Sequence, residues 1–114
     1  MAGVVVLDNT VLTNMGLVGR TDLVLRIWPG AACTTPAAHA EYVAGAAMGL
    51  VPATAWEDLA IVTLSDVEIE LAASLSARLG SGDRNGLAVA CHRQGLFTSD
   101  DLDARHAANR VGVK

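Results

Sequence analysis

Residues 3–7 (GVVVL) constrain the fold of this chain more than any other segment. The run is apolar throughout and contains three consecutive valines, so a strand formed here has no polar side. Strands of this kind are typical of parallel sheets that are covered by helices on both faces. Because Asp8 ends the run, the first strand is expected to stop there.

Predicted strands and helices alternate along the rest of the chain. Short strands are expected at 31–34 and 96–98, and 59–64 has strand character without an assigned neighbour. The predicted helices are 10–17 after Asn9 or Thr10, 22–27 after Thr21, 36–48 after Thr35, 66–79 after a capping box of Ser65 and Glu68, 83–94 between Asp83 and Gly95, and 99–110. Residues 111–113 resemble the start of another strand. This order predicts an α/β fold with a mostly parallel central sheet.

Length and composition favour one domain covering residues 1–114, since 52% of the residues are hydrophobic and can form a compact core. The apolar stretches are interrupted well before the roughly 18 residues of a membrane span, and no basic leader opens the chain. A cytoplasmic protein is therefore expected. Cys33 and Cys91 lie far apart, which argues against a disulfide framework or a zinc site.

The charge distribution limits how the chain could bind nucleic acid. The formal net charge is −4, with two basic and eight acidic residues in 1–70 and six basic and four acidic residues in 71–114. Non-specific affinity for phosphate comes mainly from Lys and Arg. Any activity on nucleic acid must therefore depend on a local site, on metal ions or on a partner.

Several acidic residues occupy positions where a parallel sheet binds ligands, outside the carboxyl ends of its strands. Asp8 and Asp100 each follow a predicted strand, and Asp83 begins a helix that should start at the same edge. Asp8 could cap the first helix or point into the crevice. Because Asn9 or Thr10 can serve as the cap, the functional interpretation of Asp8 is preferred.

Glu41 is the only charged residue between Pro29 and Trp56, on a helix that is otherwise largely apolar. Such a carboxylate lies either on the solvent face or buried with a partner or a metal ion, and the scarcity of polar neighbours favours a functional role. Asp83, Asp100 and Asp101 could equally serve as first-turn acids that suit a helix dipole. No single acid is decisive, and Asp103 is expected to be a solvated neighbour.

The joint placement of these acids carries more information than any one of them. If the strands are parallel, the carboxylates converge on one edge of the sheet, where they cannot all ionise without a compensating cation. Hard oxygen ligands suit Mg²⁺ or Mn²⁺. Such ions can activate a water for attack on a phosphodiester without a Ser, Cys or His nucleophile.

Four segments in this order resemble the motifs of the PIN-domain family, which includes the toxin nucleases of toxin–antitoxin pairs. The resemblance extends over essentially the whole chain. Each segment contains an acidic residue, and in the first and the last segment a Thr or a Ser lies near that acid. The segments are VVVLDNTVL with Asp8 and Thr10, TTPAAHAEYVAG with Glu41, LGSGDRNGLAVACHRQG with Asp83, and FTSDDLDARHAANRVGV with Ser99 followed by Asp100 or Asp101.

This resemblance implies a PIN-like three-layer α/β/α fold and a metal-dependent endoribonuclease that hydrolyses RNA with Mg²⁺ or Mn²⁺. It further implies a toxin that is neutralised by a small antitoxin, and a homodimer. Implied catalytic residues and metal ligands are Asp8, Glu41, Asp83 and Asp100, with Asp101 as the alternative fourth ligand and Thr10 and Ser99 supporting them.

The family pattern continues after residues 111–113 with a last strand and a closing helix, so a shortened member or a missing end is expected. The alternative is therefore a PIN-like binding or regulatory protein without catalysis. A phosphatase of the haloacid dehalogenase class also begins with a strand-end Asp. It ranks last, because that class requires Asp-x-Asp and position 10 is Thr.

Overall fold

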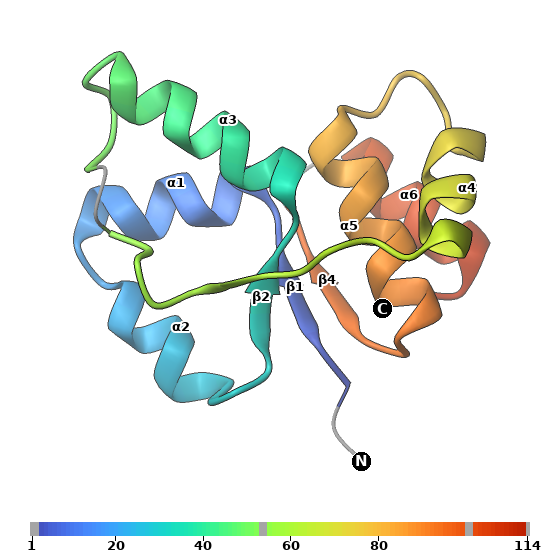
Figure 1. Cartoon of the computed structure of the whole chain (residues 1–114), viewed down its shortest axis with the longest axis horizontal. Helices are drawn as coiled ribbons and strands as arrows, with labels where there is room; N and C mark the ends of the chain where they lie inside the picture. The colour runs from blue at the N-terminus through green and yellow to red at the C-terminus, as the bar shows by residue number, and fades with distance from the viewer. Residues whose placement is uncertain (1–2, 53–54, 100–101, 114) are drawn as a thin grey trace.

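The computed structural model describes residues 3–52, 55–99 and 102–113, which form four strands and six helices. The strands are β1 (Val5–Leu7), β2 (Ala32–Thr34), β3 (Ala60–Ile61) and β4 (Leu96–Thr98), and the helices are α1 (Asn9–Val18), α2 (Thr21–Ile27), α3 (Pro36–Ala47), α4 (Asp66–Ser74), α5 (Ser81–His92) and α6 (Leu102–Val111). All strand pairs are parallel, in the order β3-β2-β1-β4 (Figure 1). The predicted α/β fold with a parallel central sheet is confirmed, and residues 59–64 supply the edge strand β3.

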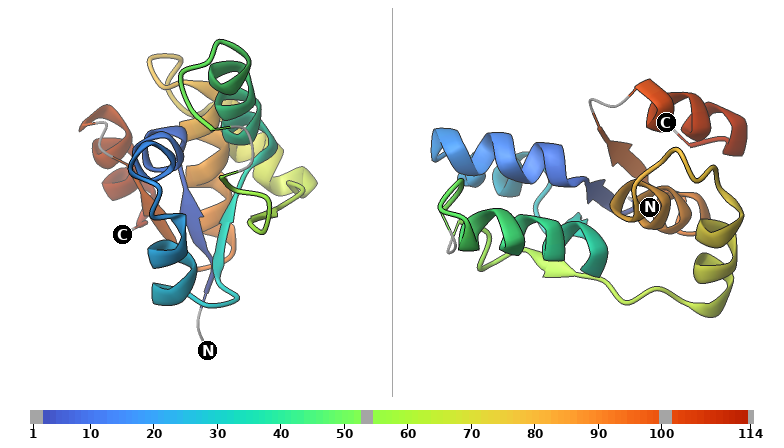
Figure 2. Two further views of the ribbon diagram at one scale, coloured as in Figure 1. Left: turned by 90° about the vertical axis from the view of Figure 1, so that its left-hand side faces the viewer. Right: turned by 90° about the horizontal axis from the view of Figure 1, so that it is seen from above.

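Alternate residues of the central strands enter two separate cores. Val5 and Leu7 pack with α1, α2 and α3, whereas Val6 packs with α5 and α6. Side chains alternate between the faces of a strand, so β1 must be apolar on both sides. Figures 1 and 2 show the resulting three layers, with α1, α2 and α3 on one side of the sheet and α4, α5 and α6 on the other. No helix in the described part of the chain combines the length and apolar character needed to span a membrane.

The beginnings of three helices differ from the prediction. Asp8 itself caps α1, because its Oδ1 accepts the N–H of Val11 at 2.9 Å. Thr21 is the first residue of α2 rather than its cap. The N-cap of α5 is Gly80, which makes Asp83 the third residue of that helix. The residues Arg20 and Gly80 that precede α2 and α5 make no side-chain capping bond, so sequence preferences for capping residues could not locate these two helix starts. The predicted caps Thr35 and Ser65 are confirmed.

The predicted strand at 111–113 is wrong. Helix α6 continues to Val111, and Gly112 then takes a φ of 79°, which a glycine adopts without steric cost. The N–H of Val113 donates to the carbonyl of Ala108 at 2.8 Å, and the N–H of Gly112 donates to that of Asn109 at 3.3 Å. This pair of bonds is a Schellman motif, which ends a helix and here buries Val113.

Gly95 was predicted to take the left-handed position that follows α5, but the helix ends one residue too early for this. Gln94 takes the left-handed conformation, with a φ of 53°. Gly95 instead allows close packing, because a Cβ at this position would lie 2.2 Å from the carbonyl oxygen of Val4. The glycine is therefore needed where the chain returns to the sheet, and not as the left-handed cap.

Helix α4 carries a carboxylate into the interior. Glu68 is 1% exposed and accepts bonds from Arg93 Nε at 2.8 Å and Nη2 at 2.9 Å. Arg93 also donates to the carbonyl of Thr63 at 2.8 Å. The bonds from Arg93, against the opposing effect of burial, lower the pKa of Glu68 to about 2. This ion pair joins α4 to the end of α5, and the bond to Thr63 adds the segment before α4.

Candidate functional site

The carboxyl ends of the strands open onto a small pocket of about 80 Å³, which we call the acidic pocket. Three segments that are distant in the sequence contribute to it: the start of α1, the first half of α3 and the start of α5. Its lining residues are Asp8, Asn9, Thr10, Glu41, Gly80, Gly82 and Asp83. None of these residues is basic, so the pocket is chemically suited to a cation.

Asp8 is held firmly where β1 passes into α1. Its side chain is nearly buried, at 3% exposure, and its N–H donates to the carbonyl of Thr98 at 3.3 Å. Capping of α1 uses Oδ1, while the carboxylate has a second oxygen with its own acceptor sites. The role of Asp8 as a cap and its position in the acidic pocket are therefore compatible.

Glu41 lies on α3 and its side chain is exposed. Of the two placements expected for it, on the solvent face or buried with a partner or a metal ion, the buried one is therefore wrong. Its position is defined by Gly82 on α5. A Cβ built on Gly82 would lie 3.0 Å from Glu41 Oε1 and 3.4 Å from the Cα of Ala38. The absence of a side chain at Gly82 thus lets α3 approach α5 and lets the carboxylate of Glu41 extend across the first turn of α5.

Asp83 reaches the acidic pocket from the first turn of α5 and is half-buried. At this end of a helix the free N–H groups and the helix dipole stabilise a negative charge. The start of α5 is therefore a favourable position for an acidic side chain that lines the pocket with Asp8 and Glu41. Asp83 is therefore both a first-turn acid of α5 and a lining residue of the acidic pocket.

The remaining predicted residues are distributed more widely. Thr10 is exposed and lines the acidic pocket, whereas Ser99 lines a separate pocket beside β4. Asp100 and Asp101 lie outside the described residues, so the predicted fourth ligand stays a prediction. Asp103 is exposed on α6 and away from the acidic pocket.

The donor atoms fit a hydrated divalent cation better than a closed metal cage. Among the described residues, no group of three or more His, Cys, Asp or Glu could hold a metal ion. Mg²⁺, however, commonly keeps several waters and binds through only one or two carboxylates. The carboxylates of the acidic pocket, with the hydroxyl of Thr10, supply the oxygen donors that such an ion prefers.

Comparison with protein families places the chain by a match over nearly its whole length. The model of the DUF3368 family, described as a PIN domain, matches residues 4–114. Neither a search of curated proteins nor a search of solved structures gave a match.

Proposed function

The chain belongs to the PIN-domain family, whose members are generally metal-dependent nucleases, and we propose that it is an endoribonuclease that hydrolyses RNA with Mg²⁺ or Mn²⁺. One observation carries the proposal: Asp8, Glu41 and Asp83 reach the same pocket at the carboxyl ends of the strands. This edge is where parallel sheets bind ligands. The carboxylates supply the hard oxygen donors that either ion requires.

In this proposal one or two of the acids Asp8, Glu41 and Asp83 bind the cation directly and the remainder bind its waters, with Asp100 or Asp101 as a further ligand. Asp8 is the most firmly held of them, because both its N–H and its Oδ1 are bonded to backbone groups. Thr10 is positioned to orient a water or a carboxylate, and Ser99 supports the neighbouring end of β4. When bound, the ion lowers the pKa of a water and neutralises charge on the leaving oxygen.

Cleavage of a labelled RNA in Mn²⁺, and its loss in EDTA, tests the activity directly. Calorimetric titration with Mn²⁺ tests the site without requiring that the chosen RNA is a substrate. Binding of Mn²⁺ together with metal-dependent cleavage is the expected result. If the folded protein neither binds Mn²⁺ nor cleaves RNA, the proposal fails in favour of a PIN-like binding or regulatory protein.

Substitution of Gly82 by alanine is expected to lower the activity of the protein without lowering its stability. The new Cβ would lie 3.0 Å from Glu41 Oε1, so the flexible carboxylate must move, whereas the contacts with Ala38 are ordinary. In a helix alanine is favoured over glycine by about 1 kcal/mol, so the melting temperature should stay level or rise. Affinity for Mn²⁺ and the cleavage rate should fall, by roughly 10-fold.

Alanine at Gly45 is a suitable control for this substitution. Gly45 is also helical, and its Cβ would meet only a side-chain atom of Val51 at 3.7 Å. Calorimetry and thermal melting of both variants make the comparison. Equal Mn²⁺ affinity in the two variants would contradict the proposed role of Glu41.

We further propose that the protein is a homodimeric toxin that a small antitoxin neutralises. What supports a partner surface is a group of exposed apolar side chains at the ends of α1 and α3, which lie side by side (Figures 1 and 2). Leu17 is 59% exposed, Val18 65%, Met48 75% and Leu50 61%. Apolar surfaces of this kind commonly mark protein interfaces.

The double substitution of Val18 and Met48 by aspartate is expected to convert a dimer into a monomer, because a charge at the centre of an apolar interface loses its hydration. Light scattering should report a change from twice the chain mass to once. Val67→Asp is the control, since Val67 is 53% exposed on α4, on the other side of the sheet. A monomeric wild-type protein, or a dimer that survives the double substitution, would rule out this interface.

A further inference from the structure

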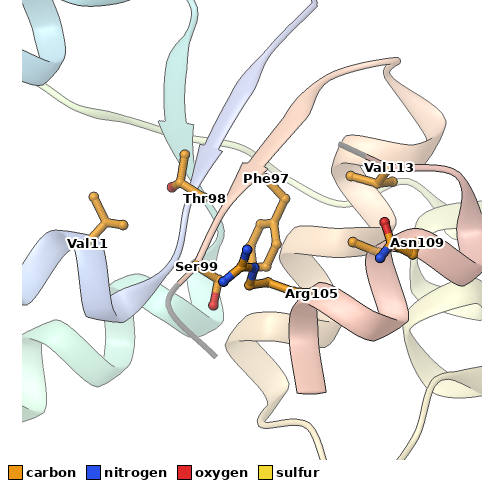
Figure 3. A pocket seen from close by; sticks show the side chains of 8 residues that line it. Val11, Phe97, Thr98, Ser99, Arg105, Asn109 and Val113 are labelled. Atoms are coloured by element: carbon orange, nitrogen blue, oxygen red, sulfur yellow. The ribbon is translucent and has the colours of Figure 1, made fainter. Parts of the chain in front are cut away.

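A second pocket, of about 540 Å³, lies beside β4 and is separate from the acidic pocket. We call it the β4 pocket. Its walls come from the first turn of α1, the end of β4, α6 and Val113, which lies two residues beyond the end of α6 (Figure 3). The lining residues are Val11, Phe97, Thr98, Ser99, Arg105, Ala108, Asn109 and Val113. Its volume is within the range of about 300–1,000 Å³ that is usual for ligand sites.

Backbone hydrogen bonds join the β4 pocket directly to Asp8. The N–H of Asp8 donates to the carbonyl of Thr98 at 3.3 Å, and the N–H of Val11 donates to Asp8 Oδ1 at 2.9 Å. Thr98 and Val11 both line the β4 pocket, whereas Asp8 lines the acidic pocket. The two pockets are therefore neighbours on either side of one residue, and a molecule that extends past Asp8 reaches both.

The β4 pocket carries a basic side chain, which the acidic pocket lacks among its lining residues. Arg105 is the charged side chain among the described residues that line the β4 pocket, and Figure 3 shows its guanidinium extending from α6 towards Ser99 and Phe97 at the end of β4. No hydrogen bond or ion pair joins Arg105 to another of the described residues. A guanidinium with free donors is the side chain best suited to a phosphate.

The other lining residues complete a surface for a nucleotide. Asn109 is exposed and offers an amide, which can bond to a sugar or a phosphate. Phe97 is half-buried and presents an aromatic ring, against which a base can stack. The ring packs closely against Gly86 on α5, since a Cβ there would lie 2.4 Å from Phe97 Cε1. Aromatic rings and guanidinium groups are both used in the recognition of single-stranded RNA.

We infer that the β4 pocket binds the nucleotide next to the phosphodiester that is cleaved, with Arg105 contacting its phosphate. This inference rests on the proposed ribonuclease function. The net-acidic chain attracts RNA weakly overall. The positive charge of Arg105, near the carboxylates, therefore supplies affinity for the RNA strand and fixes its position. Arg105 is thus a substrate-positioning residue, and the carboxylates carry the chemistry.

The test compares Arg105→Ala with Arg110→Ala in the full chain. Arg110 is exposed on the same helix and lines a different pocket, with Asp103 and His106. Fluorescence anisotropy with a labelled single-stranded RNA of about ten nucleotides gives the Kd, and cleavage of the same RNA gives KM and kcat. For Arg105→Ala we expect Kd and KM to rise about 10-fold and the salt slope of log Kd to fall by about 0.7. Arg105→Lys should lie between, because it keeps the charge and loses the planar fork.

The outcomes separate this inference from the proposed function. If wild type cleaves RNA and Arg105→Ala behaves like Arg110→Ala, the β4 pocket does not bind the strand and the ribonuclease function stands. Equal losses in both variants would also overturn the inference, since they indicate a general charge effect. If wild type binds RNA through Arg105 without cleaving it, the β4 pocket is an RNA site, but the ribonuclease function fails and with it the placement next to a cleaved phosphodiester. If wild type neither binds nor cleaves RNA, both fail.

Discussion

Replacing Asp8 by asparagine is expected to lower RNA cleavage at least roughly 100-fold without unfolding the protein. The substitution removes a negative charge from the acidic pocket and weakens any bound cation. Asparagine caps a helix about as well as aspartate, so the bond to the N–H of Val11 can be kept. On one preparation, cleavage assays in Mn²⁺ measure the activity, calorimetry measures the affinity for Mn²⁺, and thermal melting measures the stability.

Two further variants make this experiment interpretable. Asp58→Asn removes the same charge from an exposed residue outside the acidic pocket and should leave cleavage within about twofold of wild type. Asp8→Ala removes both the charge and the cap, so it should add a stability loss of about 1 kcal/mol to the loss of activity. Unchanged Mn²⁺ binding and cleavage in Asp8→Asn would refute the proposed metal site.

Replacing Arg93 by alanine is expected to cause the largest loss of stability, about 3 kcal/mol in the free energy of unfolding. The substitution leaves the carboxylate of Glu68 buried without its two charged hydrogen bonds. Arg26→Ala is the matched control, because the pair of Arg26 with Asp22 is exposed and should contribute much less to stability. Denaturant unfolding of both variants at neutral pH measures the difference.

The same ion pair predicts how this difference depends on pH. The pKa of Glu68 falls from 4.5 to about 2 in the folded protein, so its ionised form is stabilised by folding. The contribution is fully present above about pH 4.5 and is lost as the pH falls towards 2. Wild type and Arg93→Ala should therefore differ most near neutral pH and converge in acid. A difference that stays constant from pH 7 to pH 3 would contradict the ion-pair account.

Local signals in the sequence were sufficient for much of the fold. The apolar run before Asp8 and the short run at Leu96–Thr98 each form a strand of the parallel sheet, as predicted. Thr35 followed by Pro36 begins α3, because a side-chain acceptor and a fixed φ meet at the same helix start. Such features depend on residues within one helical turn, so a single sequence reveals them.

Predictions failed where two neighbouring residues could serve the same purpose. Asp8, rather than Asn9 or Thr10, caps α1, and Gln94, rather than Gly95, takes the left-handed position. In the second case the backbone of Val4 excludes any side chain from Gly95. Val4 is distant in the sequence, and no local pattern reports its approach.

The candidate site shows the same division between local and distant information. The sequence alone revealed that acids follow strands and begin helices, because strand and helix ends have recognisable local chemistry. Only the tertiary structure brought Glu41 against Gly82, bonded Asp8 to Thr98, and put Arg105 in a pocket beside them. These contacts join segments that are distant in the sequence, and their distances depend on how the strands pair and the helices pack rather than on the spacing of residues along the chain.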